Sequence, residues 1–221
     1  MSDKIIVELN NVYLKSSRGE EVFTDLNFRL QAGRSAIITG PAGSGKSSFA
    51  ELLIGRQFAY QGSVEIFGEL IRKGKNRTIR KIRQKIGGVG GIFSLIPSCT
   101  VAENITFPLI LSGQSKKVQK ERLMKMLTDF SLLKQAGESP QNLTRVENML
   151  VQFARATVAN QPLVIIDEPL AGWDKKTYQR IYDFMIRMSV SGQSMVILSG
   201  EPLPEGLPNS DNYTIQNGGL S

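Results

Sequence analysis

The 221-residue chain contains no histidine and a single cysteine, Cys99. One cysteine excludes an internal disulfide, which fits a reducing compartment. We interpret Cys99 as a small, partly buried residue rather than a nucleophile, because the chain has no histidine to activate it.

Long hydrophobic runs are also missing. The longest apolar runs are SAIIT, LVII and MVIL, far below the roughly 18 to 20 residues of a membrane-spanning helix. The first residues, MSDKIIVELNNVYL, alternate like a strand and do not have the layout of a signal peptide. Because neither feature is present, we expect a cytoplasmic chain. The 41% of residues that are hydrophobic are enough for one sizeable core.

Positive charge is in excess, with a formal net charge of +7. Much of it lies in residues 72–85, RKGKNRTIRKIRQK. This stretch could contact nucleic acid, anionic lipid or an acidic partner, but a solvated helical segment is the favoured interpretation. No aromatic residue interleaves with the charges, so no specific nucleic-acid partner is predicted.

Hydrophobic patterning predicts an α/β fold. Residues 24–30, TDLNFRL, alternate as a half-buried antiparallel strand does, whereas LVIID and MVILS are continuously apolar, as parallel strands covered on both faces are. Apolar residues between Ser115 and Gln135 have helical spacing, and Asn217-Gly218 predicts a hairpin turn. The predicted strands are Ile5–Leu9, Thr24–Leu30, Ser35–Thr39, Gly62–Ile66, Leu163–Asp167, Met195–Ser199 and Tyr213–Gln216. The expected fold is α/β, with a parallel central sheet, an N-terminal antiparallel β subdomain and a helical subdomain insertion.

Residues 40–47, GPAGSGKS, match the phosphate-binding pattern G-x-x-x-x-G-K-[ST]. Gly43 and Gly45 let the backbone turn its N–H groups toward phosphate oxygens, and the helix that follows adds its positive end. Lys46 supplies a point charge, and the Ser47 hydroxyl can bind Mg²⁺. The predicted nucleotide-binding residues are Gly40, Pro41, Ala42, Gly43, Ser44, Gly45, Lys46, Ser47 and Ser48.

A second magnesium ligand is expected at the end of the run LVIIDEP. Asp167 ends a predicted strand, at the sheet edge where open α/β sheets bind ligands. The next residue, Glu168, can polarise an attacking water and is the predicted catalytic residue. The predicted ligands are ATP and Mg²⁺, with the metal held by Ser47 and Asp167. With this loop and this carboxylate, the predicted α/β fold is that of a P-loop NTPase.

These motifs together resemble ATP-binding-cassette (ABC) ATPases. The P-loop, a long insertion, IIDEP and then Asp174 follow the order of that family, over nearly the whole chain. Residues 86–113 look like the stretch around the family's glutamine loop, closest to the branch that powers lipoprotein release, lipid transport and cell-division permeases. Leu143–Ala156 looks like the signature segment and its helix.

The resemblance implies a single ABC ATPase domain over residues 1–221. Its catalytic core and β subdomain would occupy 1–85 and 150–221, and its helical subdomain 92–149. Family members dimerise, with each ATP between one subunit's P-loop and the other's signature motif. The implied partners are a second ABC ATPase, identical or different, and an integral membrane permease. The segment FPLIL at 107–111 would receive a permease helix, or it could equally be ordinary core. The implied location is cytoplasmic, peripheral on the inner face of the cell membrane.

Several family positions are altered in this chain. The signature, leucine-serine-glycine-glycine followed by glutamine or glutamate, is replaced by LTRVE at residues 143–147. A branched valine at Val146 should block the approach of N–H groups to a phosphate, although Thr144 and Glu147 still form a capping box that starts a helix. Arg145 either offers a replacement charge or is a solvated side chain.

Three further contacts are lost. The glutamine of the glutamine loop aligns with Gly91, the switch histidine with Gly200, and the adenine-stacking aromatic with Ser16, three residues after Tyr13. ATP binding should survive on the cradle and the metal, while hydrolysis should be weak or dependent on a partner.

Two other functions remain open. One is a nucleotide-binding regulatory or structural protein of the ABC type with no transport role. The other, an unrelated P-loop kinase or GTPase, is disfavoured by the long insertion and by the loop containing Asp174.

Overall fold

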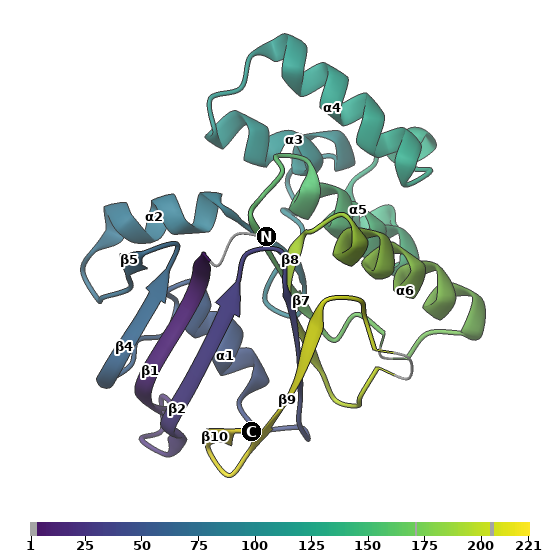
Figure 1. The fold of residues 1–221 in the computed structure, drawn as a ribbon. Helices are drawn as coiled ribbons and strands as arrows, with labels where there is room; N and C mark the ends of the chain where they lie inside the picture. Colours follow the sequence, from purple (N-terminus) through teal and green to yellow (C-terminus); the bar gives the residue numbers. More distant parts are fainter. Residues whose placement is uncertain (1–3, 171, 204–205) are drawn as a thin grey trace. The chain divides into compact units, whose positions relative to one another are not determined.

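The computed structural model describes residues 4–170, 172–203 and 206–221. The chain forms two compact units, one made of Met1–Arg83 and Ile165–Ser221 and the other of Gln84–Val164 (Figure 1).

An antiparallel sheet in the first unit has the strand order β2-β1-β4-β5 (Figure 1). Alternate residues of β2 are buried and exposed along much of its length, as predicted from TDLNFRL. Its strands are β1 (Ile5–Lys15), β2 (Glu21–Gln31), β4 (Gln61–Ile66) and β5 (Glu69–Leu70). The strands β1 and β2 are longer than predicted, because their paired register accommodates several irregularities that break the alternation.

The second sheet of this unit runs β10-β9-β3-β8-β7, and β3 pairs in parallel with both β8 and β9. Every residue of β7 and β8 is buried, which confirms the prediction from their apolar sequences. The strands are β3 (Ser35–Thr39), β7 (Leu163–Asp167), β8 (Ser194–Ser199), β9 (Ser210–Gln216) and β10 (Gly219–Leu220). Asn217 and Gly218 have positive φ and join β9 to β10, so the predicted hairpin is confirmed.

Three helices complete the first unit: α1 (Lys46–Leu53), α2 (Asn76–Gln84, of which the last residue belongs to the second unit) and α6 (Lys175–Val190). Asp174, the acidic residue after Glu168 that matched the family pattern, is the N-cap of α6. Its carboxylate accepts the N–H groups of Lys176 and Thr177 at 3.0 and 3.1 Å. The Thr177 hydroxyl, which donates to it at 2.7 Å, and then these N–H groups lower the pKa of Asp174.

The second unit contains β6 (Ile86–Gly90), α3 (Val101–Leu111), α4 (Lys116–Asp129), two short 3₁₀ helices (Leu133–Gln135 and Pro140–Asn142) and α5 (Arg145–Thr157). The helix predicted between Ser115 and Gln135 is confirmed in α4. It ends earlier than the periodicity suggested, because Ser131 has a φ of 58°.

The strand β6 was not predicted, since IGGVG is rich in glycine. A Cβ atom at Gly87 would lie 2.1 Å from the Ala156 carbonyl oxygen, so glycine is required where β6 meets α5. Among the described residues, no helix has the length and apolar character needed to span a membrane.

Candidate functional site

The loop that links β3 to α1 has the backbone of a phosphate cradle. Gly43 and Gly45 have φ values of 81° and 107°, a region that favours glycine. Gly45 is the N-cap of α1 and has no side chain to satisfy the first N–H groups of the helix. These N–H groups are therefore available to an anion, and the positive end of α1 reinforces them.

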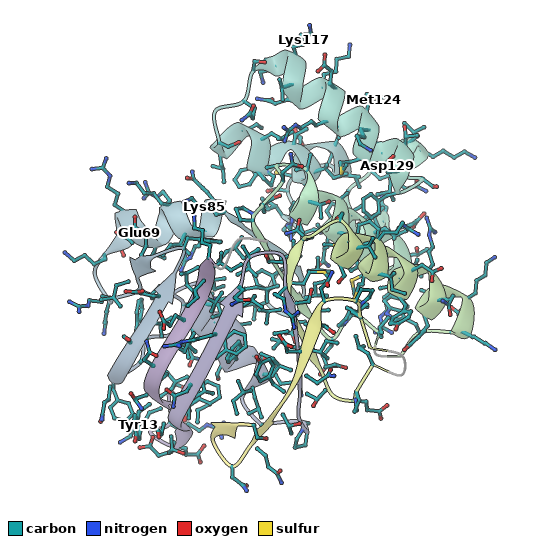
Figure 2. All side chains as sticks on the ribbon, viewed as in Figure 1. Tyr13, Glu69, Lys85, Lys117, Met124 and Asp129 are labelled. Atoms are coloured by element: carbon teal, nitrogen blue, oxygen red, sulfur yellow. The ribbon has the colours of Figure 1, made fainter. Side chains whose placement is uncertain are left out.

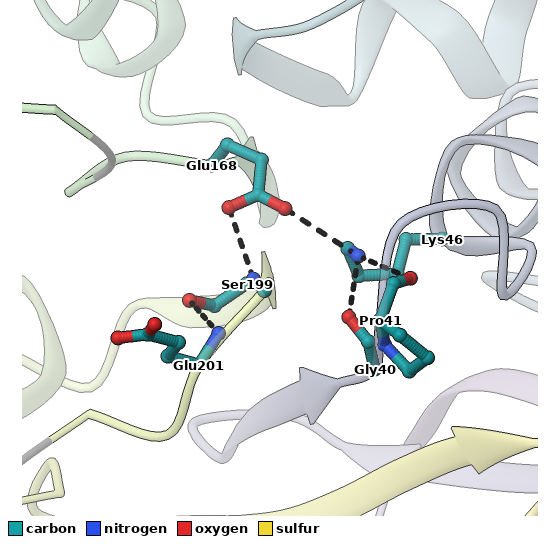
Figure 3. A network of polar contacts seen from close by, with 7 residues as sticks. Gly40, Pro41, Lys46, Glu168, Ser199 and Glu201 are labelled. Carbon is teal, nitrogen blue, oxygen red and sulfur yellow. Dashed lines mark hydrogen bonds and ion pairs between the residues drawn. The ribbon is translucent and has the colours of Figure 1, made fainter.

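Lys46 is held at the mouth of this loop, with 9% of its side chain exposed. Its Nζ atom donates to the carbonyl oxygens of Gly40 at 2.7 Å and Pro41 at 3.1 Å. It also lies 3.5 Å from Oε1 of Glu168 (Figure 3). The ammonium group is thus positioned before any phosphate arrives, and an incoming anion would compete with Glu168 for its charge.

Asp167 ends β7 and is 5% exposed. Burial raises the pKa of its carboxyl group, the neighbouring Glu168 charge raises it further, and Lys46 lowers it. A cation would stabilise the ionised carboxylate in this position.

Glu168 follows in a left-handed conformation, with a φ of 52°. Such a conformation is uncommon for a residue other than glycine and is often found at functional sites. The Glu168 N–H donates to the Leu198 carbonyl at 2.8 Å, and its Oε2 accepts the Gly200 N–H at 3.0 Å. Figure 3 shows this carboxylate between Lys46 and the end of β8, so both oxygens of the predicted catalytic residue already have a partner.

A cavity of about 700 Å³ brings these parts together within the first unit. This volume lies within the range of about 300–1,000 Å³ that is typical of small-molecule sites. Its lining residues are Ser16, Glu20, Glu21, Val22, Ala42, Gly43, Ser44, Gly45, Lys46, Ser47, Ser48, Asp167, Glu168, Asn217 and Gly218. Gly40 and Pro41, which were predicted to bind nucleotide directly, do not line the cavity and instead hold Lys46.

The cavity fits a phosphate-bearing ligand. Besides the free N–H groups and Lys46, the Ser44 Oγ atom is buried and has no hydrogen-bond partner among the described residues. A buried hydroxyl without a partner is costly, so a ligand would relieve it.

The cavity also fits Mg²⁺ that arrives with phosphate. Within the described part of the chain, no three acidic, histidine or cysteine side chains could hold a metal together. Mg²⁺ commonly takes only one or two protein oxygens and completes its shell with phosphate and water. Ser47 and Asp167 both line the cavity and could supply those two oxygens.

The part of the cavity beside the β1–β2 turn is lined by residues such as Ser16 and Val22, which offer no aromatic ring on which adenine could stack. Ser16 uses its Oγ to accept the N–H groups of Arg18 and Glu20, at 3.2 and 3.3 Å, and so stabilises the turn. Tyr13 is not among the residues that line the cavity, and its ring lies beside that of Tyr60, with 6.1 Å between the ring centroids. Among the described residues, none that lines this cavity is aromatic.

In the second unit, the altered signature still begins a helix. Thr144 is the N-cap of α5, and its hydroxyl accepts the Glu147 N–H at 3.2 Å while the Glu147 carboxylate accepts the Thr144 N–H at 2.8 Å. The predicted capping box is therefore confirmed. Val146 is half-buried and Arg145 is exposed.

The glutamine-loop position is held from α5 by a residue that the sequence did not single out. Gln152 is buried, and its Oε1 accepts the Gly90 N–H at 2.7 Å. Its Nε2 donates to Asn148 Oδ1 at 2.7 Å. Gly91, the next residue, has a φ of 43°. The only available signal was one glutamine on the apolar face of α5.

Cys99 is half-buried, as expected, and its backbone carbonyl accepts a hydrogen bond from the Asn104 side chain at 3.1 Å. The described structure assigns it no chemical role.

Comparison with known proteins gives a consistent result. The model of the ABC transporter family matches residues 23–171. The glutamate transport ATP-binding protein GluA of Corynebacterium efficiens is 29% identical over 182 residues, covering 82% of this chain and 75% of that protein. The cell division ATP-binding protein FtsE of Bacillus subtilis is 28% identical over 192 residues, covering 87% and 84%. A solved dimeric ATP-binding cassette, bound to ADP and Pi, shares the fold with a TM-score of 0.83 at 24% identity, covering 98% of this chain and 97% of that one.

Proposed function

The chain belongs to the ABC transporter family, and we propose that it is the ATP-binding subunit of a transporter and docks on a separate membrane permease. The observation that carries this proposal is the cavity that joins the loop 40–48 to Asp167 within one unit. In this proposal, the loop 40–48 binds the nucleotide phosphates through residues 42–48, while Gly40 and Pro41 hold Lys46. Ser47 and Asp167 hold Mg²⁺. Mg²⁺ held by these residues would supply positive charge that neutralises the phosphates.

We propose further that hydrolysis is weak or depends on a partner. Glu168 could act as the base, but the groups that normally surround the γ-phosphate in the family are replaced by Gly91, Gly200 and Val146. Loss of one group that stabilises transition-state charge typically slows catalysis by about 10²–10³. Loss of several should leave little turnover in a homodimer.

Dimerisation and membrane attachment follow from the family. A second ABC ATPase would supply the signature segment opposite this chain's ATP, and the relative bound to ADP and Pi is itself dimeric. An apolar surface on α3 is available for a permease: Phe107, Ile110 and Leu111 are 40%, 49% and 49% exposed. We place the subunit on the inner face of the cell membrane, held there by its permease.

A regulatory or structural protein without a permease is the second candidate, and the altered signature favours it. The relatives favour transport or cell division, since they are named as ATP-binding proteins of these systems.

The deciding experiment is purification of a tagged copy from native membranes in mild detergent. We expect a multi-spanning membrane protein to copurify in stoichiometric amount, with or without a second cassette. The matched control replaces the apolar surface, as Phe107→Ser with Ile110→Ser, and should lose the permease while still binding ATP. Recovery of an ATP-binding chain with no membrane protein would contradict the transport function.

A further inference from the structure

A second cavity in the first unit has no lining residue in common with the nucleotide site. It has a volume of about 620 Å³ and lies between the segment after α1 and helix α2. Its lining includes Arg56, Arg80, Arg83, Asn76, Phe58 and Ile79. We call it the arginine cavity.

Arg83 is fixed in place within this cavity. Its Nε donates to the Ile54 carbonyl at 2.7 Å, and one terminal nitrogen donates to the Gly55 carbonyl at 3.0 Å. A guanidinium has five N–H donors, so most of the fork is still available. Both Arg83 and Arg56 line the cavity. Burial lowers the pKa of Arg83, and the nearby Arg56 charge lowers it further.

Little negative charge compensates these cations. Arg56 lies 3.8 Å from Glu51, but no basic residue between Arg72 and Arg83 forms an ion pair with any described residue. The sequence from 72 to 85 contains no acidic residue. Figure 2 shows nitrogen-tipped side chains extending outward from α2.

The first turn of α2 adds to the positive potential. Asn76, the first residue of the helix, lines the cavity, and no acidic residue lies in that turn. The unpaired N–H groups of a helix N-terminus favour an anion.

We propose that the arginine cavity binds a phosphate group. A guanidinium group can form two parallel hydrogen bonds to the oxygens of a phosphate. The three arginines carry more positive charge than the single carboxylate of Glu51 can neutralise, so charge remains for a phosphate. Phe58 and Ile79, which are half-buried and buried, offer apolar contact to the carbon part of the ligand. The phosphate could belong to the head group of an anionic phospholipid or to a soluble phosphate ester. The lipid source rests on the proposed membrane location, whereas the soluble source does not.

Co-sedimentation of the full chain with lipid vesicles tests the lipid source. The vesicles contain phosphatidylcholine alone or phosphatidylcholine with phosphatidylglycerol. The variant Arg56→Gln with Arg80→Gln removes two cavity charges and spares Arg83, whose bonds to Ile54 and Gly55 support the fold. The matched control, Lys116→Gln with Lys120→Gln, removes two exposed charges from α4. We expect binding to phosphatidylglycerol vesicles to fall by about 30-fold in the cavity variant, and by less than about threefold in the control.

Calorimetry with glycerol 3-phosphate tests the soluble source. It is carried out on Lys46→Ala, so that the P-loop contributes little phosphate binding. Binding that disappears when Arg56→Gln and Arg80→Gln are added would support the cavity with a soluble ligand. Two results together would overturn the proposal. The cavity variant and its α4 control would bind vesicles equally, and glycerol 3-phosphate binding would be undetectable or unchanged by the cavity substitutions. An acidic protein surface would then be left as the partner.

ATP affinity, measured on the same variants, separates this inference from the proposed function. We expect the cavity variant to bind Mg-ATP as the unaltered chain does, because the two cavities have no lining residue in common.

Discussion

At the scale of single residues, Lys46 carries the strongest prediction. Its ammonium group is already held by two carbonyl oxygens and by Glu168. We expect Lys46→Ala to weaken Mg-ATP binding by at least about tenfold, since a charge-assisted hydrogen bond contributes about 1.5–3 kcal/mol. Calorimetry is the measurement, and Lys117→Ala, which removes an outward-pointing charge on α4 (Figure 2), is the control. Equal affinities for Lys46→Ala and the unaltered chain would contradict the phosphate role of this loop.

Asp167 makes nucleotide binding sensitive to pH. Its pKa is raised by burial and by Glu168, and only the ionised carboxylate can hold Mg²⁺. We expect the gain in ATP affinity that Mg²⁺ provides to decline as the pH falls from neutral, and to do so above the ordinary aspartate pKa of about 3.9. In Asp167→Asn, Mg²⁺ should increase the affinity for ATP only slightly at every pH. A gain that stays constant down to about pH 4 in the unaltered chain would argue against Asp167 as the ligand.

The same pKa shift affects folding with the opposite sign. Without metal, the folded pKa of Asp167 lies above the unfolded one, so the contribution of this group to stability is largest at low pH. That contribution is lost as the pH rises through the folded pKa. Mg-ATP should offset the loss by binding only the folded, ionised form.

At the scale of elements, helix α5 depends on its capping box. Thr144→Ala removes the hydroxyl that accepts the Glu147 N–H, and we expect a loss of about 0.5–2 kcal/mol in the free energy of unfolding. Thr144→Ser keeps the hydroxyl and should lose much less. Chemical denaturation followed by circular dichroism measures both variants. Equal stability of the two variants would mean that the cap does not hold this helix.

The end of β6, where the following loop begins, is a second part of the fold whose stability depends on α5. Gln152→Ala would leave the Gly90 N–H without its acceptor and would remove a buried amide. We expect a loss of about 1–3 kcal/mol in stability and faster hydrogen exchange at Gly90. Asn148→Ala, which removes only the outer hydrogen bond of the pair, should cost less. Unchanged exchange at Gly90 in Gln152→Ala would show that the bond does not fix the loop.

At the scale of the whole molecule, we expect the isolated protein to release phosphate from ATP at a rate near background. The rate should rise when a cassette with an intact signature is added, because that signature would cover this chain's ATP. Steady-state phosphate release is the measurement, with Glu168→Gln as the blank. Rapid release by the unaltered chain alone, abolished in that blank, would contradict this prediction.

Restoring the family residues should not act additively, because groups that work together in one transition state depend on each other. Gly200→His is sterically accessible: a Cβ atom there would lie 3.6 Å from the Glu168 carboxylate, an ordinary contact. Gly91→Gln is less favourable, since Gly91 has a φ of 43°. We expect each single variant to gain little, and the combination with glycines at positions 145 and 146 to gain much more.

The sequence by itself determined the parts of this protein whose signals are local. Residues 40–47 predicted the phosphate loop, the apolar runs LVIID and MVILS predicted buried strands, and Thr144 with Glu147 predicted the start of α5. The Asn217-Gly218 hairpin was equally readable. Each of these depends on backbone geometry or burial over a few consecutive residues, which composition and spacing report directly.

Only the tertiary structure decided which distant residues meet. Three features join segments that are separated in the chain. They are the ion pair of Lys46 with Glu168, the hydrogen bond from the Gly200 N–H to the same carboxylate, and the arginine cavity. The strand β6 was not predicted for a related reason. Its glycines allow the strand to lie close to α5, and this contact exists only in the folded chain. The spacing of residues in the sequence does not show which distant strands and helices become neighbours when the chain folds. These contacts therefore depend on tertiary packing rather than on a sequence pattern.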